Sequence, residues 1–392
     1  MSHDFIPLSV PNLKGKELEY VSEAVRAEWV STAGAYVNEF ERVIAEYVGV
    51  EKAVACQSGT AGLHTAYMLA GIKPGDLVIV PTLTFIAAVN PIKYIGADPI
   101  FFDCDSSLCI DPAKLDEFCQ FECEFRDRVL YHRATTRRIS AIVVVHVFGN
   151  MADMERIIPI ARKYHLKVVE DATEALGTKY LEGIFSGRFA GTIGDIGVYS
   201  FNGNKIITTG GGGMIVSNNV SLMNRAKHLT TQAKVDTVRF IHDEIGFNYR
   251  LTNLQAALGL AQMEQLERFI SIKERNYKAY LSYFDKIKGV NLMKFRKGTR
   301  SNHWFYSLYR HGDFLLSRDQ IMNMLGEKQV QTRPIWGLIH QQKPYVNSLC
   351  YRIVQAIDYH KNIVNLPCST SLTVDDVGYV CKCFEGVDNA TI

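Results

Sequence analysis

A lysine between an apolar run and a stretch of glycines is the residue of this chain best placed for carbonyl chemistry. Lys205 follows the run 196–201 and precedes four consecutive glycines at 210–213. An isolated lysine is ordinarily a solvated surface residue, but glycines at such a place let the backbone approach another group closely. A desolvated lysine amine is a nucleophile toward aldehydes. The tract therefore predicts a Schiff-base lysine, and Ser200, five residues earlier, can offer its hydroxyl to a phosphate.

Two further segments suit a phosphorylated pyridinium cofactor. Asp171 ends an apolar run that begins at Lys167, so its carboxylate is expected in the crevice beyond a strand, where it would keep a ring nitrogen protonated. Residues 58–61 (Ser-Gly-Thr-Ala) follow a short apolar run and open a helical pattern, whose N-terminus favours an anion. In both segments a plain helix N-cap is an alternative interpretation of the same residues.

These residues need a sheet to bring them together. Between about residues 50 and 215, apolar runs of strand length alternate with amphipathic stretches; examples of the runs are 53–56, 77–80, 141–145 and 167–171. Buried strands that alternate with helices predict a mostly parallel sheet covered on both faces. The active site of such a sheet lies at the carboxyl ends of its strands.

The texture changes after residue 253. Apolar residues recur at helical spacing from Leu254 to Ile287, which predicts one long helix or two in tandem. Short strand and helix patterns follow, so we expect a large domain at 1–252 and a smaller domain at 253–392. The polar, arginine-rich segment 122–138 is predicted to be a solvated loop, with contact to a substrate phosphate or a partner subunit as the alternative.

Composition narrows the class of protein. The 43 basic and 41 acidic residues nearly cancel, which argues against a dedicated nucleic-acid binder. No signal-peptide pattern is visible and the apolar runs are too short to cross a bilayer, so the prediction is a cytoplasmic protein without a membrane span. The nine cysteines are scattered and lack partners at zinc-site spacing, which predicts free thiols and no metal.

Taken together, the segments resemble the DegT/DnrJ-type sugar-nucleotide aminotransferases, a branch of the fold-type I enzymes that use pyridoxal phosphate. The resemblance runs over nearly the whole chain through residues 58–61, 170–177 (Glu-Asp-Ala-Thr-Glu-Ala-Leu-Gly), 200–213 and 248–250 (Asn-Tyr-Arg). Residues 145–150 and 200–214 are most similar to the LegC/PglE-type subgroup. The implied fold is a large α/β domain with a mostly parallel seven-stranded sheet, plus a smaller α+β C-terminal domain.

The resemblance also implies roles for single residues. Lys205 would carry the cofactor and move the proton, Asp171 would pair with the ring nitrogen, and Glu174 would lie near the phenolic oxygen. Phe85 would stack on the ring, although a plain core position suits it nearly as well. The implied phosphate contacts are Thr60, Ala61, Ser200 and an Asn248 that crosses from a second subunit, which makes a homodimer the expectation.

The substrate side is implied by weaker similarities. The loop with Ser31 and Thr32 corresponds to one that borders the sugar, and His303, Trp304 and Arg333 lie in C-terminal segments near the active site. Trp304 could pack on a sugar face or belong to a domain core. Gly62 departs from the family pattern, which usually has alanine there.

The implied reaction is a ping-pong transamination. L-Glutamate would leave as 2-oxoglutarate, and its amine would pass to C4 of a nucleotide-linked 4-keto-6-deoxy sugar. The specific prediction is a UDP-2-acetamido-4-keto-2,4,6-trideoxy-hexose, aminated for surface glycan biosynthesis. The alternatives are a different keto acceptor, a sugar dehydratase of the same fold, or a non-catalytic homologue. The last two are disfavoured, since dehydratases replace the lysine with histidine and a non-catalytic homologue would be expected to lose Lys205 or Asp171.

Overall fold

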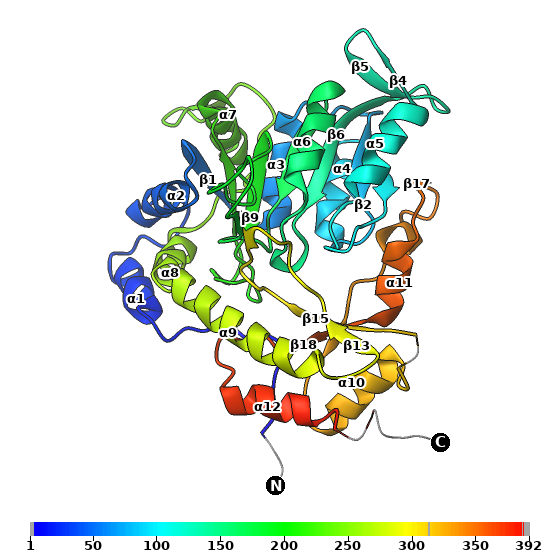
Figure 1. The fold of residues 1–392 in the computed structure, drawn as a ribbon. Coiled ribbons are helices and arrows are strands. Elements are labelled where there is room, and N and C mark those ends of the chain that lie inside the picture. Colours follow the sequence, from blue (N-terminus) through cyan, green and yellow to red (C-terminus); the bar gives the residue numbers. More distant parts are fainter. Residues whose placement is uncertain (1–3, 313, 386, 388–392) are drawn as a thin grey trace.

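The computed structural model describes residues 4–312, 314–385 and 387. A ten-stranded sheet forms the centre of the larger part of the molecule (Figure 1). Seven of its strands lie side by side in the order β1 (Lys52–Cys56), β10 (Gly213–Ser217), β9 (Ile196–Ser200), β7 (Lys167–Asp171), β6 (Arg138–Val145), β2 (Leu77–Pro81) and β3 (Asp98–Phe102). The strands from β9 to β3 are mutually parallel, and β10 runs antiparallel to β1 and β9. The predicted mostly parallel sheet is confirmed, and three strands extend it.

The first extension comes from the C-terminal third of the chain. Strand β17 (Leu349–Tyr351) pairs in parallel with β3. The large sheet therefore includes a strand from beyond residue 253, although most of the later chain forms the smaller part of the molecule.

The second extension is a hairpin where the sequence predicts a loop. Strands β4 (Cys123–Arg126) and β5 (Val129–His132) pair with each other, and β5 also pairs with β6. The turn residues Asp127 and Arg128 have φ of 49° and 63°, the left-handed conformation that matches the twist of a two-residue hairpin. The loop prediction for 122–138 is wrong, because neither turn residue is the usual glycine or asparagine. The hairpin projects from the top of the molecule in Figure 1.

Helices cover both faces of the sheet. From β1 through β2 to β3 the chain moves across the sheet toward the β3 edge, and from β3 through β6 to β7 it moves back toward the β1 edge. Because crossovers between parallel strands are right-handed, the helices that connect the strands in these two directions lie on opposite faces of the sheet. One group packs together as α3 (Gly59–Leu69), α4 (Asn90–Tyr94), α7 (Val220–Thr230) and the short 3₁₀ helix η1 (Ile86–Ala88); the other contains α5 (Pro112–Phe121) and α6 (Met154–Lys163). At the β1 edge lie α1 (Glu17–Arg26) and α2 (Ala35–Val48), on the left of Figure 1.

Two helices in tandem lead to the smaller part. They are α8 (Asn253–Met263), which begins at a capping box between Thr252 and Gln255, and α9 (Leu266–Phe284). An antiparallel sheet follows in the order β13 (Val290–Leu292), β15 (Tyr306–Arg310), β18 (Ile363–Leu366) and β16 (Arg333–Pro334). Its helices are α10 (Arg318–Glu327), α11 (Gln355–Asn362) and α12 (Val374–Lys382). The expectation of tandem helices and a smaller α+β part is confirmed.

Short elements connect the two parts of the molecule. Strand β8 (Lys179–Tyr180) pairs with β14 (Thr299–Arg300), and Ile6 forms a bridge with Val330. The remaining short elements are β11 (Lys234–Asp236), β12 (Ile241–His242), η2 (Val147–Gly149) and η3 (Ile339–Gln341).

The cysteines agree with the expectation of free thiols. All nine cysteines are free, and Cys350 is the exposed one. None of the helices in the described ranges is long and apolar enough to cross a membrane.

Candidate active site

A cavity of about 820 Å³ lies between the strand ends of the large sheet and the smaller part of the molecule. The residues that follow or end β1, β2, β6, β7 and β9 line one side; they include Ser58, Gly59, Thr60, Thr84, Phe85, Val145, Asp171, Glu174, Ser200 and Lys205. The smaller part supplies the other side, including Trp304, Phe305, Arg333, Pro334, Ile335, Trp336 and Asn365. The volume falls in the range of small-molecule sites.

Lys205 reaches this cavity from a turn directly after β9. Its backbone N–H donates to the carbonyl of Asn202 at 3.0 Å, and its side chain is 12% exposed. The Nζ atom lies 3.5 Å from Glu174 Oε1 and 4.2 Å from the centre of the Trp304 ring. The amine is therefore fixed between a carboxylate and an indole face.

Asp171 ends β7 with its carboxylate buried beside the cavity. The N–H of Thr173 donates to Oδ1 at 3.1 Å, and burial raises the pKa of Asp171. Among the described residues, no Lys, Arg or His nitrogen lies within 4.0 Å of this carboxylate. A protonated ring nitrogen in the cavity would supply the missing cation, so the site fits a pyridinium.

Glu174 lies three residues further along the chain, in the turn that follows β7, and is also buried. Its Oε2 accepts the N–H of Phe148 at 2.9 Å, while Oε1 faces Lys205. Burial raises the pKa of Glu174 to about 7, against a lowering by the Lys205 charge. The carboxyl group can therefore hold or release a proton at neutral pH.

The start of α3 forms a cradle for an anion. Ser58 caps the helix by accepting the N–H of Ala61 at 3.1 Å, and Gly59 and Thr60 line the cavity. A Cβ on Gly59 would lie 3.0 Å from side-chain carbons of both Ser200 and Thr173, so a larger residue would crowd the cradle. A cofactor phosphate fits here, where helix N–H groups and the Ser200 hydroxyl converge.

Comparison with known proteins agrees with this geometry. The family model described as the DegT/DnrJ/EryC1/StrS aminotransferase family matches residues 11–385. The chain belongs to this family. It is a pyridoxal-phosphate-dependent aminotransferase.

The relatives are similar over almost their full length. A GDP-perosamine synthase of Escherichia coli O157:H7 is 38% identical, with 96% of this chain and 97% of the relative covered. A UDP-4-amino-4,6-dideoxy-N-acetyl-beta-L-altrosamine transaminase of Campylobacter jejuni is 29% identical, with 96% and 95% covered. The solved structure of DesI in the presence of its TDP-sugar product superimposes with a TM-score of 0.85 at 26% identity, covering 97% of this chain and 92% of DesI. Both GDP- and UDP-linked names occur among the relatives, so assignment to the LegC/PglE-type subgroup stays a prediction.

The structure gathers most of the residues singled out in the sequence around this aminotransferase cavity. Thr60, Phe85, Asp171, Glu174, Ser200, Lys205, Trp304 and Arg333 line it, whereas Ala61 is buried behind Ser58 and gives its N–H to the cap. The individual roles in cofactor binding stay predictions.

Besides Ala61, four of the sequence candidates lie outside the cavity lining. His303 is buried against Tyr277 and Phe295, and burial lowers its pKa to about 4. Ser31 gives its carbonyl to the N–H of Asn253, and neither it nor Thr32 lines the cavity. Asn248 does not line the cavity within one chain either, and its expected crossing to a second subunit stays a prediction.

The departure at Gly62 has a steric reason. A Cβ there would lie 2.7 Å from Val198 Cγ1 and 3.2 Å from Cys56 Sγ. Val198 on β9 and Cys56 on β1 therefore occupy the space that an alanine methyl group would need.

The sequence interpretation gave no role to a buried pair behind the site. His146 and Glu170 are fully buried, with Nε2 2.8 Å from Oε2. The Glu170 carboxylate also accepts the N–H groups of Gly191 (2.8 Å), Ile193 (2.6 Å) and Gly194. Glu170 immediately precedes Asp171, and the backbone N–H of His146 donates to the backbone carbonyl of Asp171 at 3.0 Å. The buried pair therefore fixes the end of β7.

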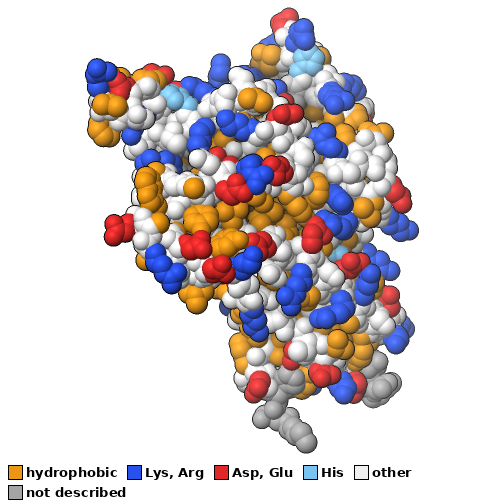
Figure 2. All heavy atoms as spheres, turned by 90° about the vertical axis from the view of Figure 1, so that its left-hand side faces the viewer, with side chains coloured by type: hydrophobic (Ala, Val, Ile, Leu, Met, Phe, Trp, Pro, Cys, Tyr) orange, Lys and Arg blue, Asp and Glu red, His pale blue; other side chains and the backbone are white. Residues whose placement is uncertain are grey.

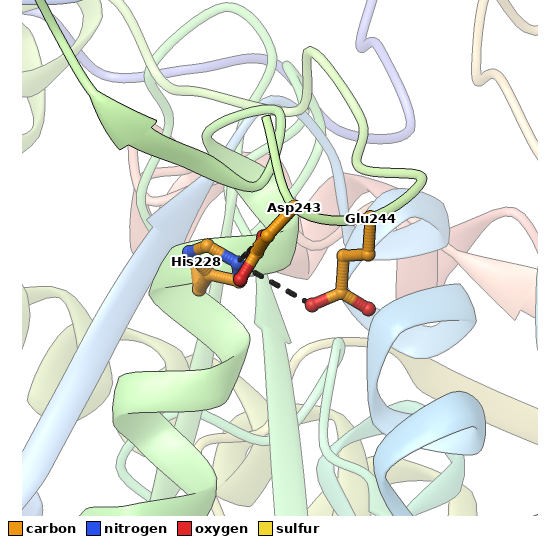
Figure 3. Close-up of side chains that lie close together, drawn as sticks. All are labelled: His228, Asp243 and Glu244. Atoms are coloured by element: carbon orange, nitrogen blue, oxygen red, sulfur yellow. Dashed lines mark hydrogen bonds and ion pairs between the residues drawn. The ribbon is translucent and has the colours of Figure 1, made fainter. Parts of the chain in front are cut away.

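One group of side chains in the described ranges has the spacing of metal ligands, and it lies away from the cavity. His228 on α7 faces Asp243 and Glu244 from the loop after β12 (Figure 3), with Nε2 2.7 Å and 3.3 Å from their oxygens. Arg225 already pairs with Glu244. The group fastens the β11–β12 segment to α7 by its own ion pairs, and the metal-free expectation stays a prediction.

Proposed function

We propose that this aminotransferase moves an amino group from L-glutamate to C4 of a nucleotide-linked 4-keto-6-deoxy hexose, giving a 4-amino sugar for surface glycans. The observation that carries the proposal is the placement of Lys205, Asp171 and Glu174 at one end of a cavity of about 820 Å³. Relatives named GDP-perosamine synthase and UDP-linked altrosamine transaminase support the substrate class.

The chemistry divides between cofactor and chain. Pyridoxal phosphate, when bound, would act as an electron sink that stabilises negative charge on the reacting carbon. Lys205 Nζ removes the proton from the donor carbon and returns one to the acceptor carbon. The Asp171 carboxylate holds the ring proton, and Ser58 and Gly59 at the α3 N-terminus orient the phosphate. Glu174 holds a proton next to Lys205 Nζ.

Side chains on both sides of the cavity suit a deoxy sugar and an attached anion. Phe85 is 54% exposed, and its ring centre lies 6.4 Å from that of Trp336. Such a pair offers an apolar face to a sugar ring and its methyl group. Arg333 lines the cavity on the same side as Trp336 and offers a guanidinium to phosphate or carboxylate oxygens.

An acceptor panel tests the proposal. The enzyme is incubated with L-glutamate and a GDP-linked 4-keto-6-deoxy hexose, the UDP-2-acetamido-4-keto-2,4,6-trideoxy-hexose, or simple keto acids, and the products are read by mass spectrometry. Amination of either nucleotide sugar well above the keto acids supports the proposal, and the preference between the two tells the GDP-linked hexose from the UDP-linked acetamido sugar as the better acceptor. Amination of the keto acids alone would establish the different-acceptor alternative, and loss of a sugar hydroxyl without amine gain would establish the dehydratase.

We further propose that the enzyme works as a homodimer in which Asn248 completes the partner's site. The β11–β12 segment just before Asn248 carries strongly exposed apolar side chains: Val235, Val238, Phe240, Ile241 and Ile245. Hydrophobic side chains also gather across the middle of the face shown in Figure 2, the side that carries α1 and α2. Exposed apolar surface of this kind is typical of an interface.

Hybrid dimers test this arrangement. Lys205→Ala and Asn248→Ala proteins are mixed, partly unfolded and refolded to exchange subunits. If Asn248 crosses, one site of each hybrid contains both native residues and activity returns. If Asn248 serves its own subunit, both sites lack a residue and activity stays at the level of the separate variants.

A further inference from the structure

Trp304 lies in the cavity wall but offers little surface to a substrate. Trp304 is 2% exposed, and its ring centre lies 5.9 Å from that of Phe148 and 4.2 Å from that of Phe305. An aromatic side chain that stacks on a bound ring needs an open face, and Phe85 at 54% exposure has one. The exposed fraction therefore separates the two aromatic residues by role.

The buried indole instead makes two contacts with the lysine segment. Its Nε1–H donates to the carbonyl of Asn204 at 2.7 Å, which fixes the backbone immediately before Lys205. Its ring face lies 4.2 Å from Lys205 Nζ. One side chain of the smaller part thus holds both the backbone and the amine of the reactive residue.

The backbone of Trp304 is itself held from two sides. Its N–H donates to Asn302 Oδ1 at 3.0 Å, and the Asn302 amide donates to the carbonyls of Glu174 and Leu176 at 2.8 Å and 3.0 Å. Its carbonyl accepts from Lys273 Nζ at 3.0 Å.

Lys273 is an unusual anchor. It is 3% exposed on α9, and Nζ also donates to the carbonyl of Cys368 at 2.6 Å. Burial lowers its pKa, and no carboxylate in the described ranges lies within 4.0 Å of Nζ. A buried ammonium that donates to two backbone carbonyls, with the Tyr306 ring centre 5.7 Å from Nζ, is costly, so its retention calls for a positional reason.

We propose that Trp304 is a positioning residue that sets the place of Lys205 Nζ, and that Lys273 holds Trp304 in that position. The inference rests on the proposed function only through the role of Lys205 and not on the identity of the sugar. Of the two alternatives that the sequence leaves open for Trp304, a sugar contact and a core position, it takes the place of the sugar contact.

The test compares Trp304→Phe, which keeps a ring but loses the N–H donor, with Trp304→Leu, which loses both. The first readout is the rate at which cofactor-free enzyme captures pyridoxal phosphate covalently, followed by absorbance after rapid mixing. We expect a fall of about 10-fold or more for Trp304→Leu and a smaller fall for Trp304→Phe, since misplacing a reactive group is costly in rate. Lys273→Met should reproduce the Trp304→Leu result.

Steady-state kinetics give the second readout, with Trp336→Leu as the matched control from the same cavity wall. If Trp304 has a positioning role, Trp304→Leu should lower kcat and leave the KM for the acceptor within about 2-fold of the wild-type value. Trp336→Leu should instead raise this KM without slowing cofactor capture. A Trp304→Leu protein with native capture rate and raised KM would establish a substrate platform and overturn the proposal. So would unchanged capture in both Trp304 variants.

Two controls keep the result interpretable. Non-covalent affinity for pyridoxal phosphate, measured in a Lys205→Ala background with and without Trp304→Phe, should not change, because the proposal concerns the amine alone. A loss of affinity there would assign Trp304 to cofactor binding and contradict the proposal. Failure of the wild-type enzyme to aminate any nucleotide sugar would refute the proposed function, but it would leave the capture readout intact.

Discussion

Lys205 Nζ and Glu174 Oε1 lie 3.5 Å apart in a place where neither side chain is more than 12% exposed. Burial opposes charge on the carboxyl group, while the ammonium favours it, and burial is the larger effect. With the pKa of Glu174 raised to about 7, the pair changes its proton count within the physiological range. A measurable consequence follows for the stability of the protein.

Replacement of Glu174 by Gln should make the cofactor-free protein less sensitive to pH. The folded pKa of about 7 lies above the ordinary value of 4.5, so the folded protein binds more protons than the unfolded chain between these values. The stability of the wild-type protein therefore falls as pH rises through this window. Glu174→Gln removes that dependence. From pH 4.5 to 8, the free energy of unfolding of the variant should therefore rise by at most about 3 kcal/mol relative to that of the wild-type protein.

Denaturant unfolding of both proteins at several pH values measures this difference. A variant-minus-wild-type difference that stays flat from pH 4.5 to 8 would show that Glu174 does not titrate in the window.

The Asp171→Asn variant should lose activity and gain stability in the absence of cofactor. The amide cannot hold a ring proton, and loss of a buried electrostatic partner lowers kcat on the order of 100-fold or more. Since burial raises the pKa of Asp171, ionisation of this group destabilises the cofactor-free fold at neutral pH, and the neutral amide relieves that cost. Activity assays and thermal melting at pH 7.5 check the two directions. Equal activity, or a lower melting temperature, would contradict the assignment.

Gly59→Ala should weaken binding of the cofactor phosphate. The new methyl group would lie 3.0 Å from the side chains of Ser200 and Thr173 and narrow the cradle. We expect the Kd for pyridoxal phosphate to rise about 10-fold, the loss of roughly one charge-assisted hydrogen bond. Gly203→Ala is the matched control, because a Cβ there meets nothing within 4 Å. The two variants should differ in affinity for pyridoxal phosphate but not for pyridoxal.

Arg333→Gln should raise the KM for the nucleotide sugar but not the KM for L-glutamate. Its guanidinium lines the cavity and can bind either the nucleotide phosphates or the glutamate carboxylate. We expect the KM for the nucleotide sugar to rise about 10-fold while that for L-glutamate changes little. The opposite pattern would assign Arg333 to the amino donor, and an unchanged pair of KM values would remove it from the binding site.

The central sheet and the core of the site were open to prediction because their signals are local. Asp171 ends an apolar run, and residues 58–61 pair a strand end with a helix start, so parallel strands bring them to one edge. Lys205 stands out because four glycines follow it. Each of these signals spans a few neighbouring residues.

The parts that the sequence did not predict depend on distant partners. Strand β17 has three residues and exists because β3 offers it an edge some 250 residues earlier in the chain. The burial of Trp304 follows from the packing of Phe148 and Phe305 around it, and no spacing rule reveals that. His303 illustrates the same point: a histidine beside the site in sequence is enclosed by Tyr277 and Phe295 in space.

The most direct measurement of the central claim locates the covalent attachment of pyridoxal phosphate. The purified enzyme with bound cofactor is reduced with borohydride, digested and analysed by mass spectrometry. We predict that the modified peptide carries the cofactor on Lys205, and that a Lys205→Ala protein shows neither the adduct nor transamination. A cofactor fixed to another lysine, or full activity of Lys205→Ala, would contradict the account.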